Sequence, residues 1–207
     1  MDNQGKSSSG QRALERLLEG NRRYAAFKLT HPNLMRARRR ALRAGQSPFA
    51  GILGCSDSRV PPELIFDLGL GDLFVIRVAG NSTGRAVLGS MEYAVSHLGV
   101  PLIVVLGHSD CGAVKASLSS GDETRGHLRH ITAAIQPALN LVDNSGIDAI
   151  NAAAKTHARR IAREMRTSSP IIAESHEEGM LNVVAAYYSI ETGKVEVLDG
   201  NKSCKDT

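Results

Sequence analysis

The chain has 207 residues, of which 42% are hydrophobic and 4% aromatic, so it is long enough for one domain with a substantial core and an added arm rather than two domains. The formal net charge of +4 is modest and comes largely from one run, RARRRALR at 36–43, which argues against a general nucleic-acid binder. The N-terminal residues lack the apolar core of a signal peptide, and no run of about 18 apolar residues occurs, so we expect a cytoplasmic protein without a membrane partner.

Residues 1–45 are predicted to form a disordered start, over 1–10, and a helical arm. A leucine stripe predicts a helix from Gln11 to about Lys28, interrupted near Gly20, and a very basic second helix from His31 to near Gly45. The arm has too little apolar surface to stand alone, so it must pack on its own core or on a partner subunit. We expect it to cross a two-fold dimer, and dimers to pair into tetramers.

From residue 46 to 207 the pattern is typical of an α/β catalytic domain. Continuous apolar runs at 49–54, 73–78 and 102–107 predict strands buried on both faces of a parallel sheet. Helices are predicted between them, at 61–69 and 86–99, and again over 126–166. Two late strands, at 180–190 and 194–199, are predicted to form a hairpin. We therefore expect a mostly parallel sheet in the order 2-1-3-4 with an additional edge strand, flanked by helices.

Chemically reactive side chains follow two of these strands. Cys55, Asp57 and Arg59 come directly after the first apolar run, and the third run is followed by HSDCG, which supplies His108 and Cys111. Ligands of open α/β sheets bind beyond the carboxyl ends of the strands. If the first and third strands are neighbours, two thiolates and one imidazole meet there as a Cys₂His set, which is a catalytic zinc pattern when the fourth position stays open.

Each half of this pattern has a plainer interpretation. Cys55 alone could be a small buried residue at a strand end, and His108 alone a hydrogen-bonded histidine in a loop. A cysteine nucleophile with a histidine base is the main alternative chemistry, although it leaves the second cysteine without a role. Three cysteines are too few for a disulfide scaffold of this size, and Cys204, in the polar tail, is not expected to bind metal.

The motifs CSDSRV at 55–60 and GHSDCGAV at 107–114 together resemble those of the β-class carbonic anhydrases, and the likeness extends over about residues 11–200. The resemblance implies that Cys55, His108 and Cys111 bind Zn²⁺, and that Asp57 and Arg59 form a catalytic dyad. It implies reversible hydration of carbon dioxide to bicarbonate and a proton, with zinc-bound hydroxide as the attacking group. Asp57 would orient this hydroxide, and Arg59 would keep Asp57 charged and away from the metal.

Further residues match the plant-like type of this family as substrate-binding positions. They are Gln46, Phe74, Tyr93 and Gly112. Gln46 could donate its amide to an oxygen of bicarbonate or carbon dioxide, and Gly112 could offer its backbone N–H. Gln46 could equally be a loop residue, Phe74 a strand-core residue and Tyr93 part of a helix face. In the family these pockets lie at a dimer interface, so some of these residues are expected to serve the neighbouring subunit.

One departure concerns a second type in the family, in which a bicarbonate-binding pocket includes a tryptophan, an arginine and a late tyrosine. The corresponding positions here are Ile52, Arg77 and Tyr188, and the chain has no tryptophan. The allosteric pocket is therefore incomplete, and we expect Asp57 to stay paired with Arg59 near pH 8 instead of moving onto the zinc.

Two other functions are compatible with the same residues. One is a related zinc hydrolase of this fold acting on CS₂ or COS, and the other is a scaffold that keeps the zinc without turnover. The arginine run at 36–43 is the one feature that favours a nucleic-acid partner, and we interpret it as a solvated helix face or an intersubunit contact.

Overall fold

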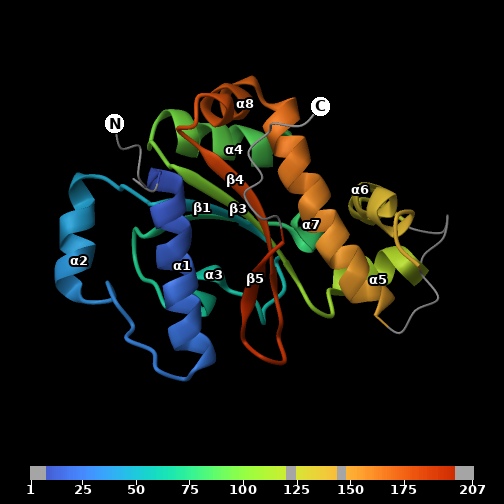
Figure 1. The fold of residues 1–207 in the computed structure, drawn as a ribbon, viewed down its shortest axis with the longest axis horizontal. Helices are drawn as coiled ribbons and strands as arrows, with labels where there is room; N and C mark the ends of the chain where they lie inside the picture. Colours follow the sequence, from blue (N-terminus) through green and yellow to red (C-terminus); the bar gives the residue numbers. More distant parts are fainter. Residues whose placement is uncertain (1–7, 120–124, 144–147, 199–207) are drawn as a thin grey trace, which may run out of the picture.

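The computed structural model describes residues 8–119, 125–143 and 148–198. Its centre is a five-stranded sheet in the order β2-β1-β3-β4-β5 (Figure 1). The first four strands run parallel, and β5 pairs antiparallel with β4 as a hairpin. The strands are β1 (Ala50–Gly54), β2 (Leu73–Arg77), β3 (Leu102–His108), β4 (Asn182–Tyr188) and β5 (Val195–Val197). The predicted fold class and strand order are confirmed.

Helices cover both faces of the sheet (Figure 1). The α-helices are α1 (Ser9–Ala25), α2 (Arg36–Ala41), α3 (Pro62–Ile65), α4 (Arg85–Ser96), α5 (Gly112–Ser119), α6 (Leu128–Leu139), α7 (Ala149–Ser168) and α8 (Pro170–Glu177), and two 3₁₀ turns are η1 (Leu42–Ala44) and η2 (Ala79–Asn81). The helix predicted over 61–69 is only the short α3, and the helical stretch predicted over 126–166 is divided between α6 and α7.

Alternation along the buried strands divides the core into two apolar clusters. Ile52 and Val104 belong to the cluster that also contains side chains of α1 and α3. Leu53 and Val105, one residue further along, belong to the cluster that contains side chains of α4, α7 and α8. Successive residues of a strand point to opposite faces, so the continuous apolar runs reflect a sheet that is covered on both sides.

The first helix, α1, packs on the chain's own sheet. It begins two residues before the predicted start at Gln11, and it is not interrupted near Gly20. The Ser8 hydroxyl caps it by accepting the Gln11 N–H at 3.2 Å, so the helix starts inside the segment predicted to be disordered; residues 1–7 of that segment lie outside the described residues. The helix continues through Gly20. A Cβ at this position would lie 1.8 Å from the Phe66 carbonyl oxygen, so a larger residue would not fit here. The glycine allows close packing, and Leu17 is buried without a partner subunit.

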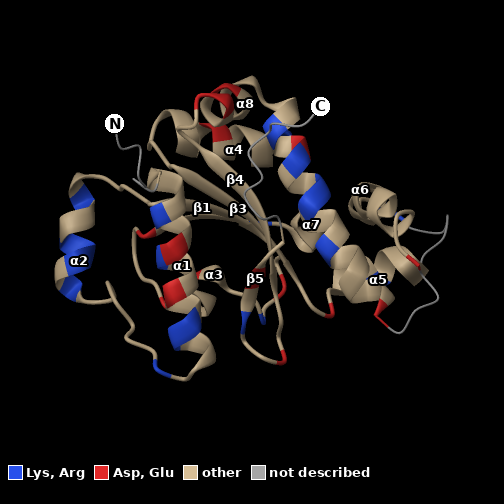
Figure 2. Ribbon diagram, in the orientation of Figure 1, with Lys and Arg blue, Asp and Glu red and all other residues tan. Residues whose placement is uncertain are grey.

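The second helix starts later than predicted, at Arg36. His31 and Asn33 adopt left-handed backbone conformations, with φ of 47° and 59°, which are incompatible with an α-helix. The His31 N–H donates to Asp67 Oδ1 at 2.9 Å and the Asn33 amide to the Asp72 carboxylate, so buried carboxylates hold this loop. α2 itself buries no residue and presents a cluster of basic side chains (Figure 2).

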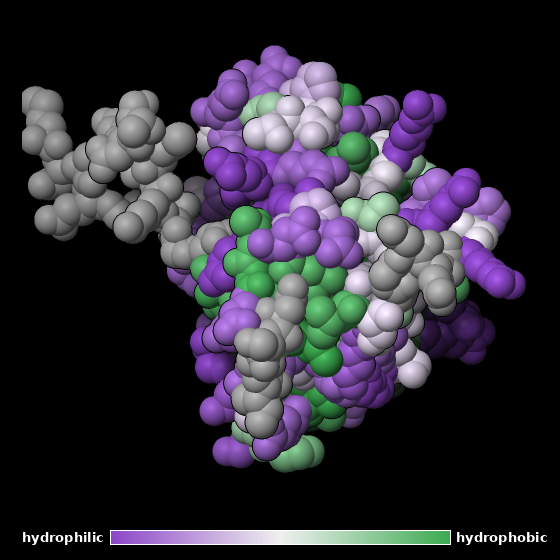
Figure 3. Space-filling model, turned by 90° about the vertical axis from the view of Figure 1, so that its right-hand side faces the viewer, coloured by the Kyte–Doolittle hydropathy of each residue, from purple (hydrophilic) through white to green (hydrophobic). Residues whose placement is uncertain are grey.

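Apolar side chains also reach the surface on the face that includes α5 and α6, where Figure 3 shows an apolar area among polar residues. Leu118, Leu128 and Leu141 are exposed in this part of the chain. No helix within the described ranges is both long and apolar enough to span a bilayer.

Candidate metal centre

Cys55, His108 and Cys111 converge beyond the carboxyl ends of β1 and β3, which are neighbouring parallel strands. Their Sγ and imidazole nitrogen atoms all lie within 4.8 Å of one another, and the three residues are at most 4% exposed. The fold brings together residues that are 53 positions apart in the sequence, as expected from the two strand ends. Two thiolates and one imidazole this close together are a donor set that can bind one zinc ion.

The hydrogen bonding of His108 leaves one ring nitrogen available. Nδ1 lies 2.9 Å from the Ser109 carbonyl oxygen, and a carbonyl can only accept, so Nδ1 carries the proton. Nε2 then has a bare lone pair, and it is buried without a hydrogen-bond partner in the described part of the chain. A buried, unpartnered acceptor facing two thiols fits a metal cation, and a backbone carbonyl that fixes the tautomer is typical of metal-binding histidines.

The thiols of Cys55 and Cys111 shift one another's pKa in opposite directions. The Cys111 thiol donates a hydrogen bond to the Cys55 sulfur, which lowers the pKa of Cys55, and this donation with burial raises the pKa of Cys111. The Gly80 N–H also donates to Cys55 Sγ, at 3.3 Å. Cysteine binds a metal as a thiolate, so the lowered pKa of Cys55 favours metal binding and the raised pKa of Cys111 opposes it.

Asp57 and Arg59 lie beside the three donors and grip one another through two bonds. The guanidinium Nε donates to Asp57 Oδ1 at 2.9 Å and Nη2 to Oδ2 at 2.6 Å. These hydrogen bonds hold the pKa of the Asp57 carboxyl well below its usual range. Arg59 Nη2 also donates to the Asp110 carbonyl at 3.2 Å, which ties this pair to the loop that carries Cys111.

Arg77, expected from the sequence only as an anion-binding position, donates hydrogen bonds to the backbone of the same loop. Its Nε donates to the carbonyl oxygen of Cys55 at 2.8 Å and its Nη2 to that of Asp57 at 2.5 Å. The register of the sheet explains this placement, because Arg77 is the partner of Gly54 at the ends of β2 and β1. The one available sequence signal was a basic residue at the end of a neighbouring strand.

Within one chain, only one of the four predicted substrate-binding residues lies at the centre. Gly112 directly follows Cys111, and there is open space where a Cβ would be. Gln46 precedes β1 and Cys55 follows it, so the strand separates them by roughly 15 Å at 3.3 Å per residue. Phe74 and Tyr93 lie together, with ring centroids 6.2 Å apart, on the edge strand β2 and on α4.

The other two positions of the incomplete bicarbonate pocket are engaged elsewhere. Ile52 is fully buried in β1, and Tyr188 is 3% exposed at the end of β4. The hydroxyl of Tyr188 lies 3.3 Å from that of Tyr24 on α1. β1 and β3 lie between the strands that carry Arg77 and Tyr188.

Two residues of α7 that sequence reasoning missed support the loops around the centre. The Asn151 side chain accepts the Asp110 N–H at 3.1 Å, and His157 lies 2.9 Å from the Gly80 carbonyl oxygen. Neither belongs to a motif. The one available signal was a polar residue on an alanine-rich helix face that is otherwise typical of core.

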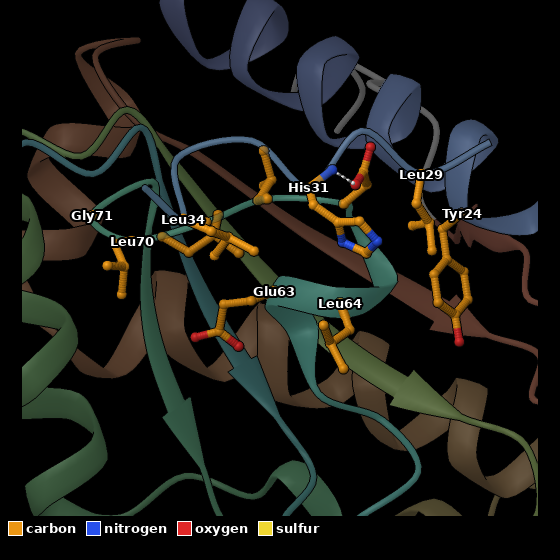
Figure 4. A pocket seen from close by; sticks show the side chains of 12 residues that line it. Tyr24, Leu29, His31, Leu34, Glu63, Leu64, Leu70 and Gly71 are labelled. Carbon is orange, nitrogen blue, oxygen red and sulfur yellow. Dashed lines mark hydrogen bonds between the residues drawn. The ribbon is translucent and has the colours of Figure 1, made fainter. Parts of the chain in front are cut away.

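A separate hollow lies between the 29–34 segment and α3, with a volume of about 420 Å³ (Figure 4). Half of its lining residues are leucines, and the three metal-donor residues do not line it. Asp67 is one of its lining residues and accepts a hydrogen bond from Arg23 Nε at 2.6 Å. Its lining residues are Tyr24, Leu29, His31, Leu34, Glu63, Leu64, Asp67, Leu68, Gly69, Leu70, Gly71 and Leu73.

Comparison with known proteins agrees with this geometry. Residues 50–195 match the family model described as carbonic anhydrase. The chain is 41% identical to a carbonic anhydrase of Mycolicibacterium smegmatis over 188 residues, covering 89% of this chain and 91% of that one. Among solved structures, the β-carbonic anhydrase CcaA superposes with a TM-score of 0.70 at 31% identity, covering 90% of this chain and 95% of that one. A tetrameric β-carbonic anhydrase of Sordaria macrospora superposes with a TM-score of 0.70 at 28% identity, covering 90% and 97%.

Proposed function

Because this chain belongs to the β-class carbonic anhydrases, we propose that it hydrates carbon dioxide at a zinc ion held by Cys55, His108 and Cys111. It is an enzyme with carbonic anhydrase activity. The observation that carries the metal proposal is the bare Nε2 of His108, buried and unpartnered beside two thiols. A hydrolase mechanism with a cysteine nucleophile would leave that donor set unexplained.

Zinc, when bound, supplies a Lewis acid that lowers the pKa of a coordinated water to about 7. The chain's own contribution is to hold three donors in fixed positions, with Asp57 two residues after Cys55 and Gly112 directly after Cys111. The carbonyl of Ser109 fixes the His108 tautomer, and the Gly80 N–H fixes the Cys55 sulfur. Such supporting hydrogen bonds orient the ligands and tune the metal.

Asp57 acts as the hydrogen-bond acceptor that orients the attacking water. The two bonds from Arg59 keep it ionised, and an ionised carboxylate can only accept. They also hold the carboxylate away from the metal, which would otherwise attract it. Arg59 is suited to this because its planar, permanently charged fork matches a carboxylate in a way that lysine does not.

Substrate binding is proposed to involve two subunits. Gly112 offers its backbone N–H at the start of α5, beside the last metal donor. Gln46, Phe74 and Tyr93 lie away from the centre of their own chain, so we propose that they serve the site of a neighbouring copy. Tyr93 is 46% exposed and Gln46 is exposed, which leaves both able to reach a partner subunit.

We propose a homodimer or a tetramer as the working assembly, with carbon dioxide and bicarbonate as the ligands. The assembly of the Sordaria macrospora relative is tetrameric. The buried, unbridged thiols of Cys55 and Cys111 suit a reducing compartment, so we propose that the enzyme works in the cytoplasm.

A stopped-flow assay of carbon dioxide hydration tests the proposed mechanism. Purified protein should turn over, lose its activity after dialysis against a strong chelator and regain it on addition of zinc. Undiminished turnover by the metal-stripped protein would refute the proposed mechanism. Hydrolysis of CS₂ or COS without carbon dioxide hydration would instead identify the related hydrolase.

A further inference from the structure

The turn η2 contacts the metal centre through one backbone group. Gly80 lies in this turn with φ 70° and ψ 19°, in the left-handed region that favours glycine. Its N–H donates to Cys55 Sγ at 3.3 Å. A Cβ at Gly80 would lie 2.7 Å from Ile135 Cδ1, so α6 closes over the turn from the other side. The geometry of the N–H···S bond therefore depends on how this one residue is held.

The carbonyl of Gly80 is bound by a histidine that lies outside the known motifs. Nε2 of His157, on α7, lies 2.9 Å from the Gly80 carbonyl oxygen and 3.0 Å from the Ser82 hydroxyl. Because the carbonyl can only accept, Nε2 must carry the hydrogen. His157 is 1% exposed, so water does not compete for this bond.

The other ring nitrogen of His157, Nδ1, is not used in hydrogen bonding within the described residues. Nδ1 is buried and has no hydrogen-bond partner in the described part of the chain. Burial, and then the nearby charge of Arg160, lower the pKa of His157 to about 4, so the ring is neutral under ordinary conditions. A buried acceptor without a partner is unfavourable, and an apolar residue of similar size would avoid it. The unfavourable burial of Nδ1 is explained if the hydrogen bond from Nε2–H to the Gly80 carbonyl has a function.

We propose that His157 is a positioning residue of the metal centre, which holds the Gly80 carbonyl and thereby aims the Gly80 N–H at the Cys55 sulfur. This inference rests on the proposed zinc site. The N–H and the carbonyl belong to successive peptide groups, so His157 acts by fixing the orientation of the turn. The N–H···S bond in turn fixes the position of the Cys55 sulfur and draws electron density from it.

The same helix supports the other half of the donor set. Asn151, six residues before His157, accepts the Asp110 N–H at 3.1 Å. Asp110 has a φ of 58° and lies between His108 and Cys111. One helix, α7, therefore contacts the loop between His108 and Cys111 directly and reaches the Cys55 sulfur indirectly, through Gly80. A helix that is anchored in the core is a more precise support than a loop would be.

The test compares His157→Gln with His157→Asn. The amide nitrogen of glutamine can take the place of Nε2, whereas that of asparagine reaches only the place of Nδ1. Zinc affinity is measured by competition with a chelating dye, and the thiolate-to-metal absorption is recorded on the cobalt-substituted protein. We expect His157→Asn to bind zinc about 10-fold or more weakly, with the absorption moved to lower energy, and His157→Gln to stay close to wild type.

A matched control separates positioning from general stability. Ile161→Ala removes a fully buried side chain one turn further along α7 and should lower thermal stability without changing zinc affinity or the cobalt spectrum. Equal zinc affinities for the Asn and Gln variants, or a loss in Ile161→Ala as large as in His157→Asn, would overturn the role of His157. Wild-type protein that binds no zinc would overturn the proposed function first, and this inference with it.

Discussion

Arg77 and Asp57 are joined by a 2.5 Å hydrogen bond from guanidinium Nη2 to the Asp57 carbonyl oxygen, while the Asp57 side chain is held by a different arginine. Arg77 Nε donates to the carbonyl of Cys55 as well. The backbone that carries a metal donor and the proposed orienting carboxylate is therefore fixed by one side chain from the neighbouring strand. Arg77, expected from the sequence to line an anion pocket, instead binds the backbone of the metal site.

This relationship predicts that Arg77→Gln impairs catalysis. The substitution removes two hydrogen bonds from a charged donor, to the carbonyl oxygens of Cys55 and Asp57, and each such bond contributes about 1.5–3 kcal/mol. We expect kcat/KM for carbon dioxide hydration to fall about 10-fold or more, and Arg77→Lys to retain part of the activity. The control is Arg85→Gln, which changes an exposed arginine at the start of α4 and should behave as wild type. Wild-type kinetics in Arg77→Gln would show that the bonds are dispensable.

The donor set predicts about one zinc per chain and its loss on removal of one thiol. Cys111→Ser should release the metal, because a serine hydroxyl does not ionise near neutral pH. Cys204→Ser is the control; Cys204 lies outside the described residues and is not expected to bind metal. Elemental analysis of protein purified without chelators gives both numbers. Full zinc occupancy in Cys111→Ser would show that Cys111 is not a ligand.

Much of this centre could be read from the sequence because its parts are local. The strand ends follow from apolar runs that stop at Gly54 and Gly107, and two motifs follow those ends directly. The pairing of Asp57 with Arg59 is also local, since the two residues are separated by one position. The strand order then brings the two motifs together, and parallel strands make that outcome one of few possibilities.

The parts that could not be read depend on contacts between distant segments. A glycine within a helical pattern lowers helix propensity and suggests a break, yet at Gly20 the absence of a side chain lets α1 pack against the Phe66 carbonyl. The roles of Arg77 and His157 require knowing which carbonyl lies opposite each side chain. The positions of Gln46 and Tyr93 follow from the fold, but their proposed roles require a second copy of the chain.

Asp67 predicts a pH-dependent stability. Burial raises its pKa, but hydrogen bonds from Arg23, Thr30 and His31 outweigh burial and lower it to about 2. A lowered carboxyl pKa stabilises the fold fully above the unfolded value of about 3.9, by about 2–3 kcal/mol, and this contribution is lost as the pH falls toward 2. Asp67→Asn should therefore destabilise the protein at pH 7 and much less near pH 2.

Chemical unfolding of Asp67→Asn and wild type at several pH values measures this difference. Glu19→Gln is the control, because the Glu19 side chain is 62% exposed and its nearest cation, Arg22, lies 3.9 Å away. Glu19→Gln should leave the free energy of unfolding unchanged at every pH. A destabilisation by Asp67→Asn that does not change with pH would show that the charge of Asp67 is irrelevant.

The placement of Gln46 predicts that complete sites form only between subunits. Sedimentation should show dimers or larger assemblies at micromolar concentration. Mixing inactive Cys111→Ser with impaired Gln46→Ala should raise activity above the sum of the two, because a hybrid dimer joins an intact donor set to an intact Gln46. An active monomer, or no gain after subunit exchange, would place all catalytic residues in one chain and contradict the proposal.

The Asp57–Arg59 pair carries the last prediction, which concerns the resting state near pH 8. Moving Asp57 onto the metal would give up two charge-assisted bonds, of 2.6 and 2.9 Å, and the exchange needs another interaction to stabilise the moved state. Bicarbonate could provide it in a complete allosteric pocket, but here Ile52 replaces a tryptophan and Arg77 is bonded to backbone. We therefore expect a crystal structure of the zinc-loaded enzyme at pH 8 to show Asp57 paired with Arg59.

Arg59→Ala should release Asp57 and lower kcat/KM roughly 10²-fold or more, since both the orientation and the ionisation of the carboxylate depend on the guanidinium. Arg59→Lys should fall between, because an ammonium keeps the charge without the paired geometry. Asp57 coordinated to zinc at pH 8 would refute the open resting state, and wild-type hydration rates in Arg59→Ala would refute the dyad itself.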